Sequence, residues 1–249
     1  MLAKQNLIII MNKDAIIEQF KSVEDKYPTL TLVFEESNQV SLSGKLSFEA
    51  FCRNDKSTSL ADSFEIKIVI DDHYPAIVPL LYETTEKIPQ DFEHINPDGT
   101  CCLGVPGELS IKFIQNPTLL YFIEELVIPF LYSASWYNRY KVYPFGERPH
   151  GLNGIFDYYK EFWHVDNNRV ACGLLFVALS TNRNLKYRGH QPCPCNSGII
   201  GRQCHGTQFQ NIFSVPNKAS FVNDCMCMMD YFEKEIKNGK KYRASKTGF

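Results

Sequence analysis

Two adjacent cysteines, Cys101 and Cys102, follow a turn-forming Asn-Pro-Asp-Gly sequence at residues 96–99. A histidine, His94, stands two residues before Asn96. A turn rich in Gly, Pro, Asn and Asp presents neighbouring side chains at the surface, and an accessible thiol reacts once it ionises. The loop is therefore a candidate nucleophilic site, at which a sulfur could carry an acyl group as a thioester.

Two other interpretations of the cysteine pair remain open. Both thiols could be buried packing groups of the core. Alternatively, the two neighbours could form a disulfide that acts as a redox switch, since the strained ring that it closes would make the bond easy to reduce.

A second cysteine cluster lies near the carboxyl end, with the spacing Cys-x-Cys-x8-Cys-His over Cys193, Cys195, Cys204 and His205. Three sulfurs and one imidazole suit tetrahedral zinc, and four protein ligands leave no open coordination position. Gly198 allows the chain to reverse between the two ligand pairs. The spacing therefore predicts a structural zinc site.

The elements that must position the cysteine pair form a helix followed by strands. A helix is predicted from Asn12 to about Lys26, where Pro28 ends it. Alternating apolar residues then predict strands over Leu30–Phe34, Val40–Phe51 and Phe64–Ile70, and a short fourth strand over Leu80–Tyr82. Tyr74-Pro75 and Pro79 predict an extended loop before that fourth strand.

The chain after the cysteines is expected to be mainly helical. Helices are predicted over Thr118–Tyr132, His150–Phe162, Asn168–Ser180 and about Ser220–Lys237. The aromatic segment Ser135–Phe145 is expected to be a loop. We expect one domain over residues 1–182 and a zinc-binding appendage over residues 183–249.

Composition bounds the function of the 249-residue chain. A hydrophobic content of 44% predicts a packed globule, and a formal charge of −2 gives no electrostatic case for binding nucleic acid. The run Val170–Leu179 is about half a membrane span, and Met1–Asn12 lacks the features of a signal peptide. Nine cysteines is an odd number, and four of their positions suit chemistry other than disulfides, which favours a reducing cytoplasm.

The order of these features resembles that of ubiquitin-conjugating enzymes over about residues 12–165. The resemblance is carried by a strand, then Tyr74-Pro75-x3-Pro79, then His-x-Asn at residues 94–96 and Gly-x-x-Cys-Leu at residues 99–103. It implies an α+β fold, with an antiparallel meander sheet flanked by helices and the small zinc-binding appendage at the carboxyl end.

The resemblance also implies roles for the loop residues. Cys102 takes the position of the nucleophile and Cys101 that of an aliphatic residue, although the neighbours exchange roles if the loop is remodelled. Asn96 takes the position of the asparagine that steadies the oxyanion, and His94 that of a residue ordering the loop. Because the Asn96-to-Cys102 spacing is about two residues shorter than in eukaryotic members, Asn96 as a turn residue and His94 as a local base remain alternatives.

The carboxyl-terminal cysteine cluster resembles the SEC-C zinc motif of bacterial proteins. All four ligand positions match it. Asn196 replaces a usual glycine and Ile199-Ile200 replace usual lysines, which weakens any expectation of binding through a basic surface.

Together the two resemblances point to the prokaryotic branch of the conjugating enzymes, found in antiphage operons such as type II CBASS. They imply a bacterial cytoplasmic transferase that carries the C-terminal glycine of a cGAS/DncV-like nucleotidyltransferase as a cysteine thioester. The sequence has no Gly-rich nucleotide loop, so either a separate activating enzyme supplies the activated carboxyl or the covalent bond forms by another route. A catalytically inactive binding scaffold and a redox-regulated adaptor for the same partner remain the alternatives.

Overall fold

A computed structural model of the chain describes residues 13–35, 39–52, 55–181 and 189–246. The chain divides into two compact units. One, here called the sheet unit, comprises Met1–Gly104 and Lys112–Glu147. The other, here called the helical unit, comprises Val105–Ile111 and Arg148–Phe249.

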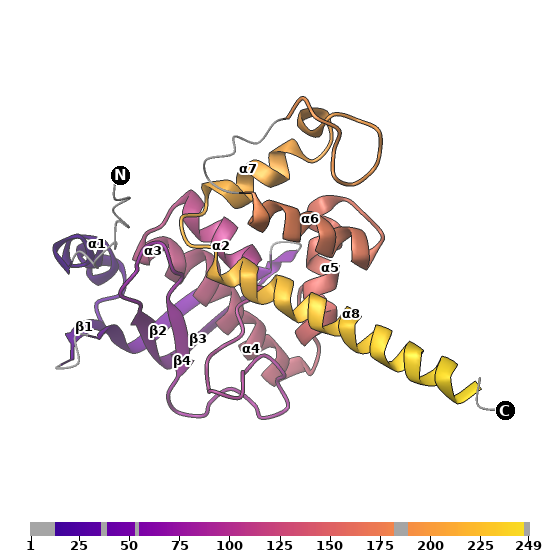
Figure 1. Ribbon diagram of the computed structural model, residues 1–249. Helices are drawn as coiled ribbons and strands as arrows, with labels where there is room; N and C mark the ends of the chain where they lie inside the picture. The colour runs from indigo at the N-terminus through magenta and orange to yellow at the C-terminus, as the bar shows by residue number, and fades with distance from the viewer. Residues whose placement is uncertain (1–12, 36–38, 53–54, 182–188, 247–249) are drawn as a thin grey trace. The chain divides into compact units, whose positions relative to one another are not determined.

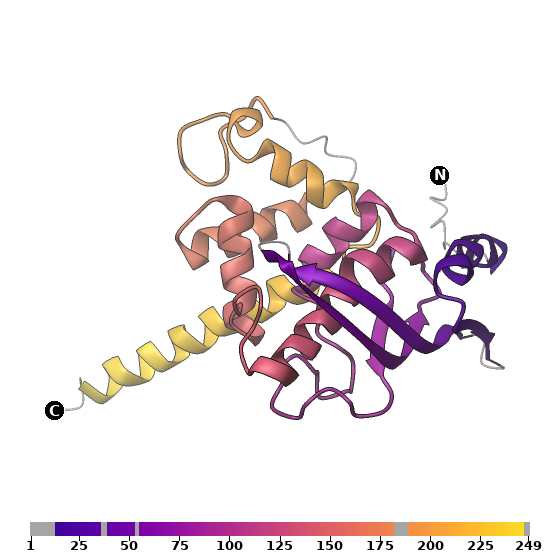
Figure 2. The ribbon, with the colours of Figure 1, turned by 180° about the vertical axis from the view of Figure 1, so that it is seen from behind.

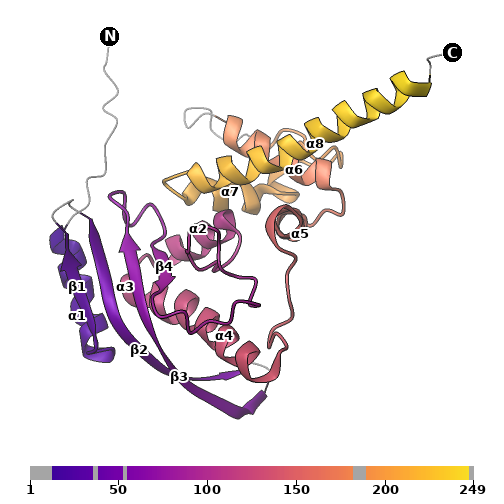
Figure 3. The ribbon, with the colours of Figure 1, turned by 90° about the horizontal axis from the view of Figure 1, so that it is seen from below.

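The sheet unit contains a four-stranded antiparallel sheet with the order β1-β2-β3-β4 (Figure 3). Its first elements are α1 (Lys13–Lys26), β1 (Leu30–Phe34), β2 (Val40–Cys52), β3 (Asp55–Ile70) and β4 (Leu80–Glu83). Strands adjacent in sequence are adjacent in the sheet, so the predicted antiparallel meander and the α+β class are confirmed. The predicted helix start at Asn12 lies outside the described residues.

Strand β3 is longer than the sequence indicated, because it begins at Asp55 rather than Phe64. Its first half, Asp55–Ser63, pairs with the end of β2 and builds a long hairpin (Figure 2). This half is mostly polar, so it lacks the alternation of apolar residues that identifies a half-buried strand. In the second half, the four apolar side chains predicted to share a face are all at most 3% exposed: Phe64, Ile66, Ile68 and Ile70.

A continuous helical segment follows in the sheet unit, made of α3 (Leu119–Phe122), the π-helical turn η1 (Ile123–Val127) and α4 (Ile128–Tyr140). The turn is wide because the Ile128 N–H bonds to Ile123 O, five residues back. It accommodates Pro129, which has no N–H to donate. The prediction of a loop over Ser135–Phe145 was therefore wrong for its first part, because α4 continues to Tyr140. Aromatic packing along the helix explains the difference, because the ring centroids of Trp136 and Tyr140 lie 4.6 Å apart.

The segment Leu119–Tyr140 is long and apolar enough to cross a membrane by length and composition. However, 56% of its most apolar window is buried within the fold. Phe122, Ile123 and Leu131 have no exposed surface. The apolar character of this segment is accounted for by its place in the core of the sheet unit.

The helical unit is built around the last helix of the chain (Figure 1). Its elements are the first part of α2 (Pro106–Gln115), then α5 (Gly151–Trp163), α6 (Asn168–Ser180), the 3-10 turn η2 (Gly201–Gln203), α7 (Gly206–Ser214) and α8 (Ala219–Lys246). Helix α8 packs against both α5 and α6. For this reason α5 and α6 group with the carboxyl-terminal elements, whereas the sequence placed them before a boundary at residue 182, which lies outside the described residues.

Candidate cysteine loop and metal site

Cys101 is held at the edge of the sheet beside β4. Its N–H donates to Leu81 O at 2.8 Å, and on its other side the residue forms an antiparallel bridge with Ile95. The residue is only 7% exposed. Burial raises the pKa of its thiol to about 12, and the Glu83 backbone N–H offsets only part of this effect. Cys101 is therefore a neutral, buried group in the resting protein.

Cys102 is the more accessible thiol of the pair. Its N–H donates to His94 O at 2.8 Å, and its side chain is half-buried. Burial raises the pKa of the thiol, although the Gly104 backbone N–H favours the thiolate. The sulfur is thus reachable but mostly protonated at neutral pH.

Asn96 closes the turn that precedes the cysteines. Its amide nitrogen Nδ2 donates to Thr100 Oγ1 at 2.9 Å, and its backbone N–H donates to Thr100 O at 2.8 Å. Asp98 accepts two bonds from Thr100, at 2.6 and 3.0 Å. Gly99 has φ +83, a left-handed conformation that favours glycine. In this geometry Asn96 acts as a turn residue, and an oxyanion role would require its side chain to leave Thr100.

His94 orders the loop through its backbone and its ring. Its carbonyl fixes Cys102, as described above. Its ring centroid lies 5.0 Å from that of Phe92 and 5.4 Å from that of Tyr143. Tyr137 joins the same aromatic cluster at 4.9 Å from Tyr143. The sequence did not identify Phe92 and Tyr143 as supports of the loop, and the density of aromatic residues after position 135 was the only signal of such a cluster.

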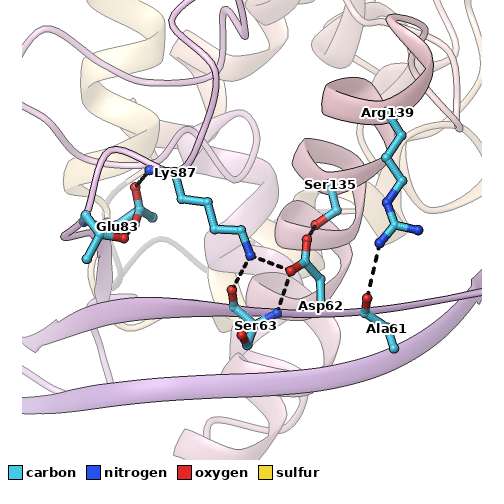
Figure 4. A network of polar contacts seen from close by, with 8 residues as sticks. Ala61, Asp62, Ser63, Glu83, Lys87, Ser135 and Arg139 are labelled. Carbon is cyan, nitrogen blue, oxygen red and sulfur yellow. Dashed lines mark hydrogen bonds and ion pairs between the residues drawn. The ribbon is translucent and has the colours of Figure 1, made fainter.

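A polar network joins the long hairpin, the turn after β4 and helix α4 (Figure 4). Asp62 accepts hydrogen bonds from Lys87 Nζ and from Ser135 Oγ, the latter at 2.6 Å. Burial alone would raise the pKa of Asp62, but these donors hold it below its ordinary value. The Glu83 carboxylate accepts a 2.8 Å hydrogen bond from the Lys87 backbone N–H and so stabilises the turn after β4, which precedes the cysteine loop in the chain. This network was not predicted from the sequence.

The four predicted metal ligands of the helical unit lie together. Their ligand atoms are all within 4.8 Å of one another. His205 Nδ1 lies 3.2 Å from Cys193 Sγ and 3.3 Å from Cys204 Sγ, and the sulfurs of Cys195 and Cys204 are 3.5 Å apart. Bond lengths of about 2.0–2.3 Å from zinc to nitrogen and sulfur require ligand separations close to these values. The cluster can hold a metal ion, and its donors fit zinc.

A second contact supports this fit. His205 Nε2 lies 2.6 Å from Trp163 O. A carbonyl only accepts, so Nε2 carries the proton and Nδ1 is left with a lone pair that faces the sulfurs. The Trp163 carbonyl at the end of α5 was not foreseen from the sequence, because it is a backbone group 42 residues from the histidine.

The chain between the ligands folds as a tight reversal. The Cys193 N–H donates to Ile199 O at 2.8 Å, and Pro192 and Ile200 form an antiparallel bridge. Asn196 and Gly198 have φ values of +63 and +76. Glycine suits this left-handed region and asparagine tolerates it, so both residues help bring the two ligand pairs together.

No protein-family model matches the chain, and no curated protein matches it. Among solved structures, the chain is similar to the UEV domain of yeast vps23, whose crystal structure contains a vps27 PSDP peptide. The two are 13% identical with a TM-score of 0.28, over 42% of this chain and 74% of that chain. No inference about function is drawn from a likeness at this level.

Proposed function

We propose that this protein is an acyl carrier of the ubiquitin-conjugating type and that Cys102 is its nucleophile. The observation that carries the proposal is the contrast within the pair, because Cys102 is half-buried and reachable whereas Cys101 is 7% exposed. The α1–meander–cysteine loop order, together with the motifs that resemble those of conjugating enzymes, supports the choice of reaction.

The reaction has two steps. The Cys102 sulfur attacks the carbonyl of a partner's activated C-terminal glycine, the thiol proton passes to solvent, and the activating group leaves. A thioester between Cys102 and the glycine results. An acceptor amine then attacks that carbonyl, so that an amide forms and the Cys102 thiol is released. The energy is supplied by the activated carboxyl, which a separate activating enzyme would deliver.

The raised pKa of Cys102 suits such a carrier. A mostly protonated thiol reacts only slowly with oxidants and alkylating agents, since the thiolate is the reactive form. Loading then depends on the partner presenting an activated carbonyl at the sulfur. We therefore assign specificity to docking of the partner rather than to a resident base.

The partner that the resemblance to antiphage conjugating enzymes implies is a cGAS/DncV-like nucleotidyltransferase with a C-terminal glycine, in a bacterial cytoplasm. In this proposal the zinc site is structural. Zinc held by Cys193, Cys195, Cys204 and His205 would fix their loop against the end of α5, where His205 bonds to Trp163 O.

The second candidate is a non-catalytic binding scaffold for the same partner. It is favoured by the Asn96 side chain, which bonds to Thr100 Oγ1 instead of standing free to steady an oxyanion. In that case neither cysteine would become acylated.

The test is an intact-mass measurement of the protein co-expressed with the products of its neighbouring genes. The samples are wild type, Cys102→Ala and the matched control Cys101→Ala, each with and without hydroxylamine. We expect a partner-sized adduct that hydroxylamine removes, that Cys102→Ala abolishes and that Cys101→Ala retains. An adduct-free wild type whose partner is fully active would establish the scaffold instead.

A further inference from the structure

The metal cluster of the helical unit has two buried ligands and two that reach the surface. Cys193 and His205 are only 2% and 7% exposed. Cys195 and Cys204 are both partly exposed. Cys195 lies in a loop in which the other residues from 194 to 199 are exposed. Solutes therefore have access to the side of the cluster formed by this pair, which we call the exposed pair.

The two sulfurs of the exposed pair are neighbours. Cys195 Sγ and Cys204 Sγ lie 3.5 Å apart. A disulfide bond is about 2.05 Å long, so the sulfurs have to come closer by about 1.5 Å to join. At Gly198, between them in the chain, no atom of the described residues beyond its chain neighbours lies within 4 Å of the place that a Cβ would take. The loop is loosely packed there, which leaves room for this movement.

Metal binding puts both sulfurs of the exposed pair in their reactive form. A thiol that coordinates zinc is deprotonated, and the thiolate is the form that peroxides oxidise. This distinguishes the exposed pair from Cys102, whose thiol is mostly protonated because burial raises its pKa. Access, proximity and ionisation thus coincide at the exposed pair.

Other contacts hold the rest of the cluster in place. His205 Nε2 lies 2.6 Å from Trp163 O, and the Cys193 N–H donates to Ile199 O at 2.8 Å. Neither bond uses a sulfur of the exposed pair, so both can persist when that pair reacts. The two buried ligands alone are too few for zinc, because a structural zinc site has four ligands.

We propose that Cys195 and Cys204 form a reversible oxidation site, at which a peroxide makes a disulfide and the zinc is released. One thiolate attacks an oxygen of hydrogen peroxide and becomes a sulfenic acid, and hydroxide leaves. The other thiolate attacks the sulfenic sulfur, so that the S–S bond forms and a second hydroxide leaves. The two sulfurs lose two electrons, the peroxide gains them, and two protons from solvent convert both hydroxides to water.

This inference concerns the metal cluster alone and goes beyond the proposed function, which it does not require. A dithiol reductant returns the disulfide to two thiols, and zinc then binds again. The disulfide cross-links the same loop that the zinc cross-links, so the loop stays closed while Cys193 and His205 lose their metal. The site is therefore structural in the reduced protein and sensitive to peroxide.

The test treats zinc-loaded Cys102→Ala with hydrogen peroxide. This background is used because a disulfide of the Cys101–Cys102 pair also removes two hydrogens, although it leaves the zinc bound. A metal-binding dye measures the zinc released, and intact mass and peptide mapping measure and locate the disulfide. We expect release of one zinc and loss of two hydrogens per chain, with a peptide that joins Cys195 to Cys204, and recovery with dithiothreitol and zinc. Retention of the zinc, or its release without this disulfide, would overturn the proposal.

A variant in the same background tests the role of the pair directly. Cys195→His keeps a nitrogen ligand at the position but removes one sulfur of the exposed pair. The matched control is Cys227→Ser on α8, which removes a partly exposed thiol outside the cluster. We expect Cys195→His to release zinc several-fold more slowly than its parent and Cys227→Ser to release it equally fast. Equal rates for Cys195→His and its parent would overturn the proposal; if Cys195→His takes up no zinc, the disulfide mapped in the parent still decides.

Discussion

Asp224 on α8 provides the sharpest test of the physical reasoning about the helical unit. Its side chain has no exposed surface. Oδ2 accepts bonds from the Gly107 N–H and the Tyr159 hydroxyl, both at 2.9 Å, whereas Oδ1 has no hydrogen-bond partner among the described residues. Burial raises the pKa of this carboxyl from 3.8 to about 6, even though both donors favour the ionised form. Keeping the charge buried at neutral pH therefore costs stability.

The sign and size of this cost follow from linkage. Because the folded protein holds this proton more tightly than the unfolded chain, the contribution of Asp224 to stability is fully present below about pH 4 and is lost as pH rises through about 6. The difference of roughly two pKa units corresponds to about 3 kcal/mol, with roughly half of it developing between pH 5 and pH 8. Asn cannot ionise. The free energy of unfolding of Asp224→Asn, relative to that of wild type, should therefore rise by about 1.5 kcal/mol from pH 5 to pH 8, whatever constant packing cost the substitution has.

Urea unfolding at pH 5 and pH 8 measures this gain. The chain has two tryptophans, Trp136 in the sheet unit and Trp163 in the helical unit. Trp136→Phe is therefore used as the background, so that fluorescence reports the helical unit. The exposed Asp230 on the same helix supplies the control, Asp230→Asn, for which no such gain is expected. If wild type and Asp224→Asn show the same pH dependence, the two donors fully offset the burial, and the reasoning about Asp224 is refuted.

Three further predictions concern the other sites. A maleimide should label Cys102 several-fold faster than Cys101 in the folded protein, and the rate at Cys102 should rise with pH up to at least pH 9. Peptide mapping that shows equal labelling of the two cysteines would contradict the difference in their burial. A strong chelator should remove one zinc per chain and destabilise the helical unit, and Cys193→Ser should bind less zinc. If the urea unfolding transition followed by Trp163 fluorescence is unchanged after verified zinc removal, the site adds no stability. Asp62→Ala should lower the free energy of unfolding of the sheet unit by about 1–3 kcal/mol, because Lys87 and Ser135 lose their acceptor. Asp91→Ala, at the exposed pair with Lys141, should change that free energy much less.

The parts of the fold that the sequence predicted are those governed by local patterns. The alternation of Phe64, Ile66, Ile68 and Ile70 located the second half of β3, and the spacing of four ligand residues located the metal cluster. The turn before the cysteines followed from Asn96 to Gly99. In each case the residues that determine the structure lie within about a dozen positions of one another, so composition and spacing are sufficient.

The features that were missed depend on partners distant in sequence. Asp62 and Ser135 are separated by 73 residues, and Gly107 and Asp224 by 117. An isolated Asp on a polar strand or within a helix does not reveal whether it will meet a donor there. The same holds for the division into units, because α5 and α6 are assigned by their packing on α8 and not by any change in composition.

Backbone geometry at the cysteine pair bears on the alternatives that composition leaves open. The N–H of Cys101 points to Leu81 and that of Cys102 to His94, on opposite sides of the chain. This segment is therefore extended, and successive side chains in an extended segment point to opposite faces. A disulfide between these neighbours would require this extended segment to change conformation, so we expect oxidised glutathione to leave the pair unjoined and instead to form a mixed disulfide at Cys102. Intact mass before and after treatment separates the two products: loss of two hydrogens without added glutathione would show that the loop rearranges readily, and would favour the redox-regulated adaptor over the acyl carrier.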